Sequence, residues 1–225
     1  MKDKKLISIY KKLFQAFGPQ HWWPGDTPFE VAVGAILTQN TNWGNVEKAI
    51  NNLKREKALS ARAIHDMPIK KLAALIQPSG YFNVKAKRLK SFINFLMNDY
   101  HGSMQRLKKE EMHSLRRKLL SVNGIGPETA DSILLYALDK PIFVIDAYTK
   151  RVLSRHKILG HDDSYEKYQE LFHLSLKRDV KLFNEYHALF VRAGKEFCKP
   201  KSRCEECPLK KRVQGFNGSR VRVKC

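Results

Sequence analysis

The chain has 225 residues, 43% of them hydrophobic, which is enough for a sizeable core in one compact unit or in two small lobes. Its formal net charge of +20 predicts a polyanionic partner and an affinity that falls as salt rises. No apolar run approaches the roughly 20 residues of a membrane-spanning helix, and no signal peptide is visible. We therefore expect a cytoplasmic, nucleoid-associated protein with no membrane partner.

Helical periodicity dominates the chain and strand-like alternation is scarce, so we expect an all-α fold. Capping boxes open two of the helices, one at Thr27–Glu30 and one at Asp163–Glu166, and Pro78-Ser-Gly80 breaks the chain between helices. The expected helices span residues 5–17, 28–37, 43–56, 61–66, 69–76, 84–98, 110–121, 128–138, 145–156, 166–177 and 181–197.

The stretch from Leu120 to Asp131 predicts a helix, a tight glycine turn and a second helix. Gly124 and Gly126 can take backbone angles that residues with a Cβ avoid. They also leave the N–H groups of the turn bare, beside the positive end of the helix that starts near Pro127. Such a turn binds a phosphate without reading any base, so it predicts a grip on a nucleic-acid backbone.

A lone carboxylate, Asp146, follows the hairpin by fifteen residues. A fixed carboxylate beside a sugar stabilises an oxocarbenium-like transition state or activates water, as in glycoside hydrolysis. Asp146 is therefore the candidate catalytic group. The alternative is that it caps the helix beginning at Ala147, and both roles can coexist.

The four cysteines, Cys198, Cys204, Cys207 and Cys225, all lie in the last 28 residues. A disulfide framework would normally span the fold, so this crowding indicates a metal site. Thiolates at the spacing of the first three can converge on one centre.

The hairpin Val122–Asp131, Asp146 after Val144-Ile, and the clustered cysteines occur in an order that resembles the endonuclease III superfamily of DNA glycosylases, the helix-hairpin-helix Gly-Pro-Asp group. The resemblance covers essentially the whole chain and implies two helical lobes with a DNA-reading cleft between them. It implies a central lobe over 23–136 that ends in the hairpin at about 115–138, a terminal lobe formed by 1–22 and 137–197, and a cysteine cluster loop with a basic tail over 198–225.

Position 128 separates two kinds of chemistry in that superfamily. Bifunctional members have a lysine there, which attacks the sugar and cleaves the strand through a Schiff base. This chain has Glu128, which cannot form that imine, so the resemblance implies a monofunctional enzyme without lyase activity. Glu128 either binds substrate or water, or is a solvated first-turn residue favoured by the helix dipole.

A closer resemblance is to the endonuclease III-like 3-methyladenine DNA glycosylases. It rests on Trp22-Trp-Pro24, Leu37-Thr-Gln-Asn-Thr41, Pro78-Ser-Gly-Tyr-Phe82, Lys85-Ala-Lys87, the hairpin with Glu128, and Asp146-Ala-Tyr148. In that subgroup the corresponding aromatic residues and proline line the base pocket, here Trp22, Trp23, Pro24 and Trp43. Flat tryptophan faces favour a cationic base by roughly 0.5–2 kcal/mol. The alternative for Trp22 and Trp23 is core at the lobe interface, and Tyr148 either faces the pocket or packs beneath it.

The resemblance also implies DNA contacts, because the target base must be flipped out of the stack. Gln39 lies where relatives fill the vacated gap, and Tyr81 lies where relatives wedge the opposite strand, unless it is core. The remaining DNA-binding candidates are Asn40, Lys85, Lys87, Arg88, Gly124, Gly126 and Thr129. Each lysine is alternatively just a solvated residue. The carbonyls of Val122 and Ile125 are candidates for a monovalent cation.

For the cysteines the resemblance implies a [4Fe–4S] cluster with a structural role. Relatives have the fourth cysteine at the position that Val213 occupies here, so Cys225, which seventeen residues separate from Cys207, is the expected fourth ligand. Zinc and a vestigial site are the alternatives.

We therefore expect a monomeric, monofunctional DNA glycosylase of base excision repair that acts on double-stranded DNA with a damaged or mismatched base. Alkylated purines, with 3-methyladenine foremost, are the expected substrates. The first alternative is an endonuclease or AP lyase, with another lysine such as Lys150 forming the imine. The second alternative is a non-catalytic DNA-binding hairpin module.

Overall fold

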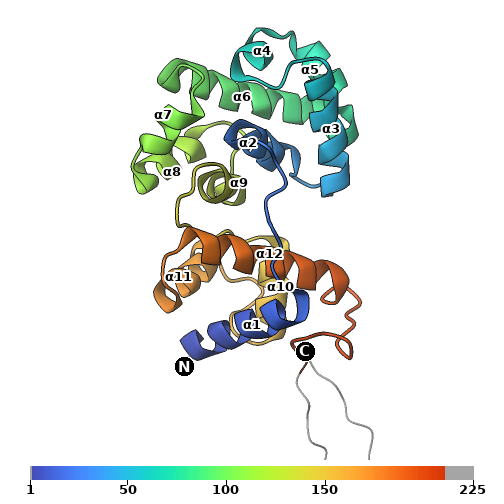
Figure 1. The fold of residues 1–225 in the computed structure, drawn as a ribbon, viewed down its shortest axis with the longest axis vertical. Helices are drawn as coiled ribbons and strands as arrows, with labels where there is room; N and C mark the ends of the chain where they lie inside the picture. Colours follow the sequence, from blue (N-terminus) through green and yellow to red (C-terminus); the bar gives the residue numbers. More distant parts are fainter. Residues whose placement is uncertain (1, 211–225) are drawn as a thin grey trace, which may run out of the picture. The chain divides into compact units, whose positions relative to one another are not determined.

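The computed structural model describes residues 2–210, and every regular element in that range is helical (Figure 1). The chain divides into a terminal unit, Met1–Trp22 with Pro141–Cys225, and a central unit, Trp23–Lys140. The α-helices are α1 (Lys2–Phe17), α2 (Pro28–Leu37), α3 (Trp43–Arg55), α4 (Ala61–Asp66), α5 (Ile69–Leu75), α6 (Phe82–Tyr100), α7 (Met104–Lys109), α8 (Met112–Ser121), α9 (Pro127–Ser132), α10 (Ala147–Arg155), α11 (Tyr165–Ser175) and α12 (Val180–Glu196). The all-α prediction is confirmed.

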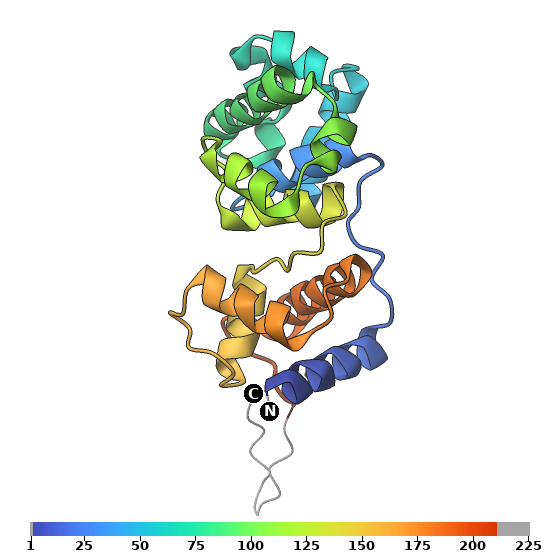
Figure 2. The ribbon, with the colours of Figure 1, turned by 90° about the vertical axis from the view of Figure 1, so that its left-hand side faces the viewer.

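In the central unit, α2 and α6 form the centre of the packing (Figures 1 and 2). Seven consecutive residues of α2, Val31–Leu37, are buried because neighbouring helices cover the helix all round. The long helix α6 contacts α2, α4, α5 and α7. Its buried face includes Leu89, Phe92 and Leu96, which are fully buried. Burial of these side chains, at about 1.5–3 kcal/mol each, is the main force that holds the unit together.

Capping side chains fix the residues at which several helices begin. Thr27 caps α2 by accepting the N–H of Glu30 at 3.1 Å, as predicted. The Glu30 carboxylate, however, pairs with Lys54 at 2.8 Å. The prediction of a second capping box that begins at Asp163 was wrong. Ser164 is the cap instead: it accepts the N–H of Lys167 at 3.1 Å, and α11 begins at Tyr165.

The helix predicted over 128–138 divides in two. The α-helix α9 ends at Ser132, and a π-helical segment, η2 (Ile133–Ala137), continues it. The short helix α7 was not predicted, and a 3₁₀ turn, η1 (Gln77–Ser79), forms at the expected break. Residues after Ala137 stay with the central unit as far as Lys140, whose N–H donates to Leu134 O at 2.9 Å.

In the terminal unit, α12 packs against α10 and α1, and α1 also contacts α11. The core is aromatic: Phe143 and Phe172 stack with ring centroids 3.6 Å apart, and the Tyr186 hydroxyl donates to Leu6 O at 2.7 Å. At Gly194 an added Cβ would lie 2.4 Å from Tyr148 Cδ1, so this glycine is what lets α10 and α12 approach so closely.

Among residues 2–210 no helix combines the length and the apolar character that crossing a bilayer requires.

Candidate active site

Asp146 caps α10 in the terminal unit. Its backbone is extended, and its Oδ1 accepts the N–H of Thr149 at 2.7 Å, so the predicted capping role is confirmed. The residue is buried, with 8% of its surface exposed. From α12, the Nε2 of His187 lies 3.6 Å from Oδ2 of the same carboxylate. The carboxylate is therefore held from two sides, by its own helix and by α12.

The surroundings of Asp146 favour its charged form. Burial raises the pKa of this carboxyl, but the attraction of His187 and the hydrogen bond from the Thr149 N–H outweigh burial, so the pKa lies below its ordinary value. The carboxylate is therefore ionised at neutral pH. A fixed negative charge with little water around it is what a developing cation requires for strong stabilisation.

The segment that leads into Asp146 is fixed by three side chains of α11. The N–H of Phe143 donates to His173 Nε2 at 3.0 Å, and Phe143 O accepts from Gln169 Nε2 at 2.7 Å. Ile145 N–H donates to the Tyr165 hydroxyl at 3.2 Å. These bonds hold the backbone at Asp146 in one position, which is the preorganisation that a catalytic group needs.

The glycine turn between α8 and α9 is built as predicted at Gly124 and differently at Gly126. Gly124 has φ +86°, and an added Cβ would lie 2.2 Å from Arg88 Cγ, so glycine is required there on both grounds. Gly126 has φ −90°, an ordinary extended angle, and no atom within 4 Å of the Cβ position. The prediction of an unusual backbone angle at Gly126 was therefore wrong.

Four of the candidate DNA-binding residues meet at this turn. Gln39 Nε2 donates to Gly124 O at 3.0 Å and to Thr129 Oγ1 at 2.9 Å, and Arg88 donates to Gln39 Oε1. The segment that follows α2 is thereby attached to the hairpin. Asn40, next in the chain, is exposed with φ +54°.

The hairpin has two further internal supports. Ile125 N–H donates to Val122 O at 3.1 Å, and the monovalent cation expected near these carbonyls stays a prediction. Arg116 of α8 forms a bidentate pair with Asp131 of α9, at 2.7 and 3.1 Å, and the Asp131 carboxylate is fully buried. Asp131 therefore joins the two helices of the hairpin.

Two of the predicted pocket tryptophans lie together in the central unit. Trp23 meets Trp43 edge to face with ring centroids 5.3 Å apart, and it lies 4.9 Å from the ring of Tyr136. A Cβ on Gly34 would lie 3.3 Å from Trp43 and 3.4 Å from Trp23, so a glycine beneath makes room for both rings. We did not predict Tyr136, because nothing in its sequence context distinguishes it from a core tyrosine.

The other predicted pocket residues are not brought together in the same way. Trp22 belongs to the terminal unit, where Lys195 Nζ lies 5.8 Å from its ring. Pro24 is exposed, and Tyr148 is half-buried against Gly194 and under the guanidinium of Arg151. Their roles as pocket residues stay predictions.

Lys85 is the one predicted DNA contact that the structure contradicts. Lys85 is 1% exposed, and its ammonium donates to Leu37 O and Ser79 O, so it does not reach a phosphate. The helical period places Lys85 on the same stripe as Leu89 and Phe92, which is the buried face of α6. Lys87 lies on another face of the helix and is exposed, as expected. Tyr81 is 73% exposed with φ +45°, which excludes the alternative that it is a core residue. Glu128 is exposed in the first turn of α9, and its catalytic role stays a prediction.

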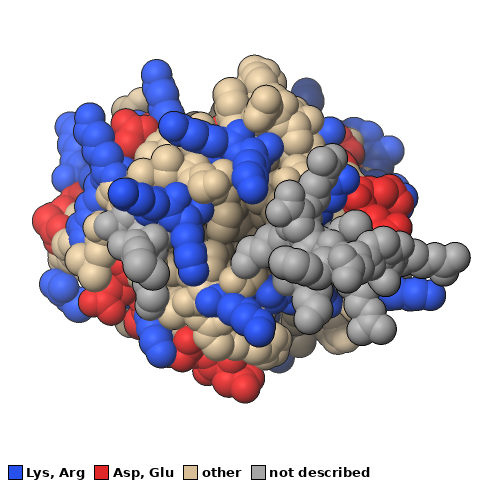
Figure 3. Space-filling view, turned by 90° about the horizontal axis from the view of Figure 1, so that it is seen from below, with Lys and Arg blue, Asp and Glu red and all other residues tan. Residues whose placement is uncertain are grey.

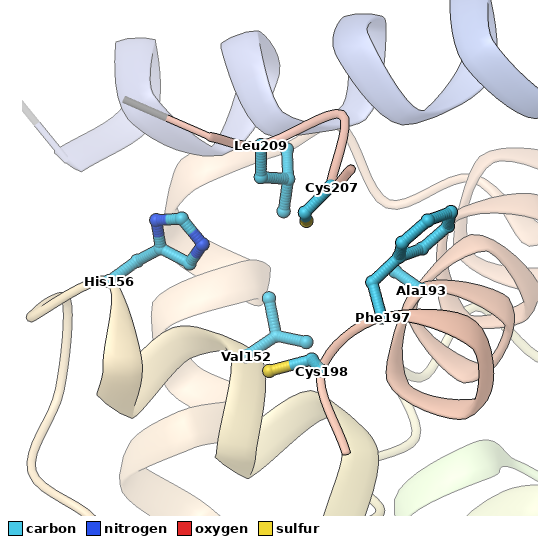
Figure 4. Close-up of a pocket in the computed structure, with 7 residues that line it drawn as sticks. All are labelled: Val152, His156, Ala193, Phe197, Cys198, Cys207 and Leu209. Atoms are coloured by element: carbon cyan, nitrogen blue, oxygen red, sulfur yellow. The ribbon is translucent and has the colours of Figure 1, made fainter. Parts of the chain in front are cut away.

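The cysteine loop follows α12. The sulfur atoms of Cys198 and Cys207 point into a small cavity that Val152, His156 and Phe197 also line (Figure 4). Both are free thiols, burial raises the pKa of Cys207, and Arg155 donates to Cys198 Sγ at 3.3 Å.

The fit of this loop to a cluster is partial. Its donors are those an iron–sulfur cluster uses, but the cavity of about 10 Å³ holds at most one water molecule. Within the described range no three His, Cys, Asp or Glu side chains gather around one point, and Cys225 lies outside that range. The cluster therefore stays a prediction, and no chemical step is assigned to it.

Basic side chains are abundant on the described surface. Figure 3 shows lysines and arginines across one face, with acidic side chains toward its edge. On the terminal unit, Lys4, Lys5 and Lys12 border a groove whose apolar lining includes Ile9 and Ile158. This distribution fits the polyanionic partner that the net charge predicts.

Known proteins resemble the chain along nearly its whole length. Residues 33–178 match the HhH-GPD superfamily of base excision DNA repair proteins. A protein of Methanocaldococcus jannaschii, provisionally named a DNA repair glycosylase, is 48% identical over 215 residues, covering 93% of this chain and 97% of that protein. A thymine/uracil-DNA glycosylase of Pyrobaculum aerophilum is 28% identical over 224 residues, covering 94% and 91%.

Solved structures share the fold. The H. pylori 3-methyladenine DNA glycosylase bound to 1,N6-ethenoadenine aligns with a TM-score of 0.75 at 29% identity, covering 87% of this chain and 97% of that one. An endonuclease III in a non-covalent complex with DNA aligns with a TM-score of 0.79 at 20% identity, covering 92% of each chain. The predicted fold class is confirmed by both.

Proposed function

The chain belongs to the HhH-GPD superfamily of base excision DNA repair proteins and is a DNA glycosylase, and within that class we propose a monofunctional enzyme that excises alkylated purines. The resemblance to endonuclease III-like glycosylases drawn from the sequence is thereby confirmed. Substrate and mechanism are our proposal.

The observation that carries this proposal is the buried, ionised Asp146 at the start of α10. Breaking the bond between C1′ and the base nitrogen leaves positive charge on the sugar. A carboxylate beside C1′ stabilises that charge, and water then adds to C1′, loses a proton to the solvent and gives an abasic site. The bonding electrons leave with the base.

An alkylated purine suits this site because it leaves without a strong general acid. A purine methylated at a ring nitrogen is cationic, so loss of the glycosidic bond neutralises it. Trp23 and Trp43 lie together and are each partly exposed, and aromatic rings attract a cationic base. The relationship to the H. pylori 3-methyladenine DNA glycosylase supports the same substrate class.

The absence of strand cleavage follows from position 128. Glu128 stands in the first turn of α9, where an imine-forming lysine would be needed for lyase chemistry. Lys150, the other lysine considered, donates to Asp163 O at 3.2 Å and lies over the ring of Tyr168. These contacts hold its amine away from a nucleophilic role.

A second candidate substrate class is uracil or mismatched thymine. It is favoured by the relationship to the thymine/uracil-DNA glycosylase of Pyrobaculum aerophilum, which covers 94% of this chain. Neutral pyrimidines gain less from aromatic faces than cationic purines do, so we rank this class second.

The test is a panel of duplexes that each contain one lesion: 3-methyladenine, 1,N6-ethenoadenine, 7-methylguanine, uracil, and thymine opposite guanine. We expect release of 3-methyladenine, intact strands until hot alkali cleaves them, and no adduct with borohydride. Release of pyrimidines alone would overturn the substrate assignment. Strand breaks or a trapped adduct would support a lyase, and binding without release would support a non-catalytic module.

We also propose that Cys198, Cys204, Cys207 and Cys225 bind a structural [4Fe–4S] cluster. The spacing of the first three and the convergence of two thiols support it. Iron and sulfide analysis of anaerobically purified protein should give four of each per chain. Stoichiometric zinc without iron would replace this assignment with a zinc site.

A further inference from the structure

A buried ammonium group joins two turns of the central unit. Lys85 is 1% exposed, and its Nζ donates to Leu37 O at 2.8 Å and to Ser79 O at 2.6 Å. Leu37 is the last residue of α2, and Ser79 is the last residue of η1. One side chain of α6 therefore holds the C-terminal ends of two short helices together.

Both helix ends lead directly into turns with unusual backbone angles. After Leu37 the chain runs to Gln39 and to Asn40, which has φ +54°. After Ser79 it runs through Gly80, with φ +70°, to Tyr81, with φ +45°. Left-handed angles at non-glycine residues cost of order 1 kcal/mol or more, so they persist only where neighbouring contacts hold them.

The same helix also holds the far end of the first turn. Arg88, one turn beyond Lys85 on α6, donates to Gln39 Oε1, and Gln39 Nε2 donates to the hairpin at Gly124 O. Lys85 and Arg88 thus connect α6 with the Gln39 turn, the Tyr81 turn and the hairpin. These are the three segments that we propose contact DNA.

A purely structural explanation accounts poorly for a lysine at this position. Its two hydrogen-bond partners are carbonyls at helix ends, whose partial negative charge offsets only part of the lost hydration, and no carboxylate pairs with it in the bonds described. Burial, and secondarily the charge of Arg88, lower the pKa of Lys85 to about 8. An apolar side chain of the same length would avoid this cost, but it would release both turns.

We infer that Lys85 is a positioning residue that fixes the Gln39 turn and the Tyr81 turn relative to each other, so that both enter the duplex together when a base is flipped. This inference rests on the proposed function. It predicts that the loss of Lys85 impairs flipping and leaves the chemical step and general DNA binding intact.

The test compares Lys85→Met with Lys87→Met, an exposed neighbour on the same helix. Hydrogen exchange of the free protein should become faster by on the order of tenfold at residues 38–41 and 79–82 in Lys85→Met alone. Unchanged exchange in both segments overturns the inference. This measurement needs no substrate, so its result is independent of whether the lesion assignment is correct.

Base release gives the second readout. In Lys85→Met the single-turnover rate on duplex DNA should fall on the order of tenfold or more, while the rate on a single-stranded oligonucleotide with the same lesion stays within about twofold. The lesion is whichever base the wild-type panel shows to be released. Equal losses on both substrates would indicate general damage to the site and overturn the inference.

A double-mutant cycle keeps the inference testable if Lys85→Met folds poorly. Lys85→Gln retains one amide donor and serves as the replacement for all measurements. In a Gln39→Ala, Tyr81→Ala background the Lys85 substitution should cause little further loss of duplex activity, because it acts through those residues. Additive losses would contradict the inference.

Discussion

In the central unit, long side chains of α6 hold the exposed turns, whereas in the terminal unit a backbone N–H of the helix that Asp146 caps holds its carboxylate. Lys85 and Arg88 span from α6 to neighbouring turns. Asp146 is fixed within α10 by the N–H of Thr149. The comparison indicates that the position of the turns depends on side chains of another helix, whereas the position of Asp146 depends first on a local cap.

The largest effect is expected from a substitution that strains the hairpin turn. Gly124→Ala should lower the free energy of unfolding by about 2–4 kcal/mol, because the backbone angle is left-handed and the new Cβ meets Arg88. Gly126→Ala is the matched control, with open space and an ordinary angle, and should change stability by less than about 0.5 kcal/mol. Denaturant unfolding of both variants measures the difference, and equal losses would contradict our view of the turn.

A second prediction concerns the pH dependence of stability that the buried ammonium of Lys85 causes. Because the pKa of folded Lys85 is lowered from 10.5 to about 8, the unfolded chain binds the extra proton between these pH values. Wild-type stability relative to Lys85→Met should therefore rise by about 1–3 kcal/mol as the pH increases from 8 to 10.5. Parallel stability curves for the two proteins would show that the side chain titrates normally.

A third prediction concerns the imidazole beside the candidate catalytic carboxylate. In His187→Leu the pKa of Asp146 should rise, since the attraction that opposes burial is lost. The acid limb of the pH–rate profile should then move to higher pH, with a smaller change near neutrality. Phe183→Leu, in the same helix and the same core, is the control, and a profile that shifts equally in both variants would count against an electrostatic role of His187.

The smallest expected effect concerns phosphate contact by an exposed lysine. Lys87→Ala should reduce the slope of log affinity against log salt by about one unit and weaken binding equally for damaged and undamaged duplexes. Fluorescence anisotropy at several salt concentrations measures it. A loss confined to damaged DNA would show instead that Lys87 takes part in lesion recognition.

The sequence predicted the helices and their capping residues better than it predicted side-chain environments. Asp146 as a helix cap, Thr27 as another, and the glycine turn follow from local rules that depend on a few adjacent residues. The bond from Lys85 to Leu37 O, the proximity of His187 to Asp146, and the pairing of Tyr136 with Trp23 depend on residues distant in the chain. Sequence periodicity carries no information about such long-range pairs, so only the three-dimensional structure reveals them.

The measurement that tests the account most directly is single-turnover release of 3-methyladenine by Asp146→Asn, with duplex affinity measured on the same preparation. The amide keeps the shape of the side chain, and its oxygen retains the capping bond, while the negative charge is lost. We predict that the rate falls on the order of 10²–10³-fold or more while affinity for DNA changes little. Release at a wild-type rate by a variant that binds and folds normally would contradict the central claim.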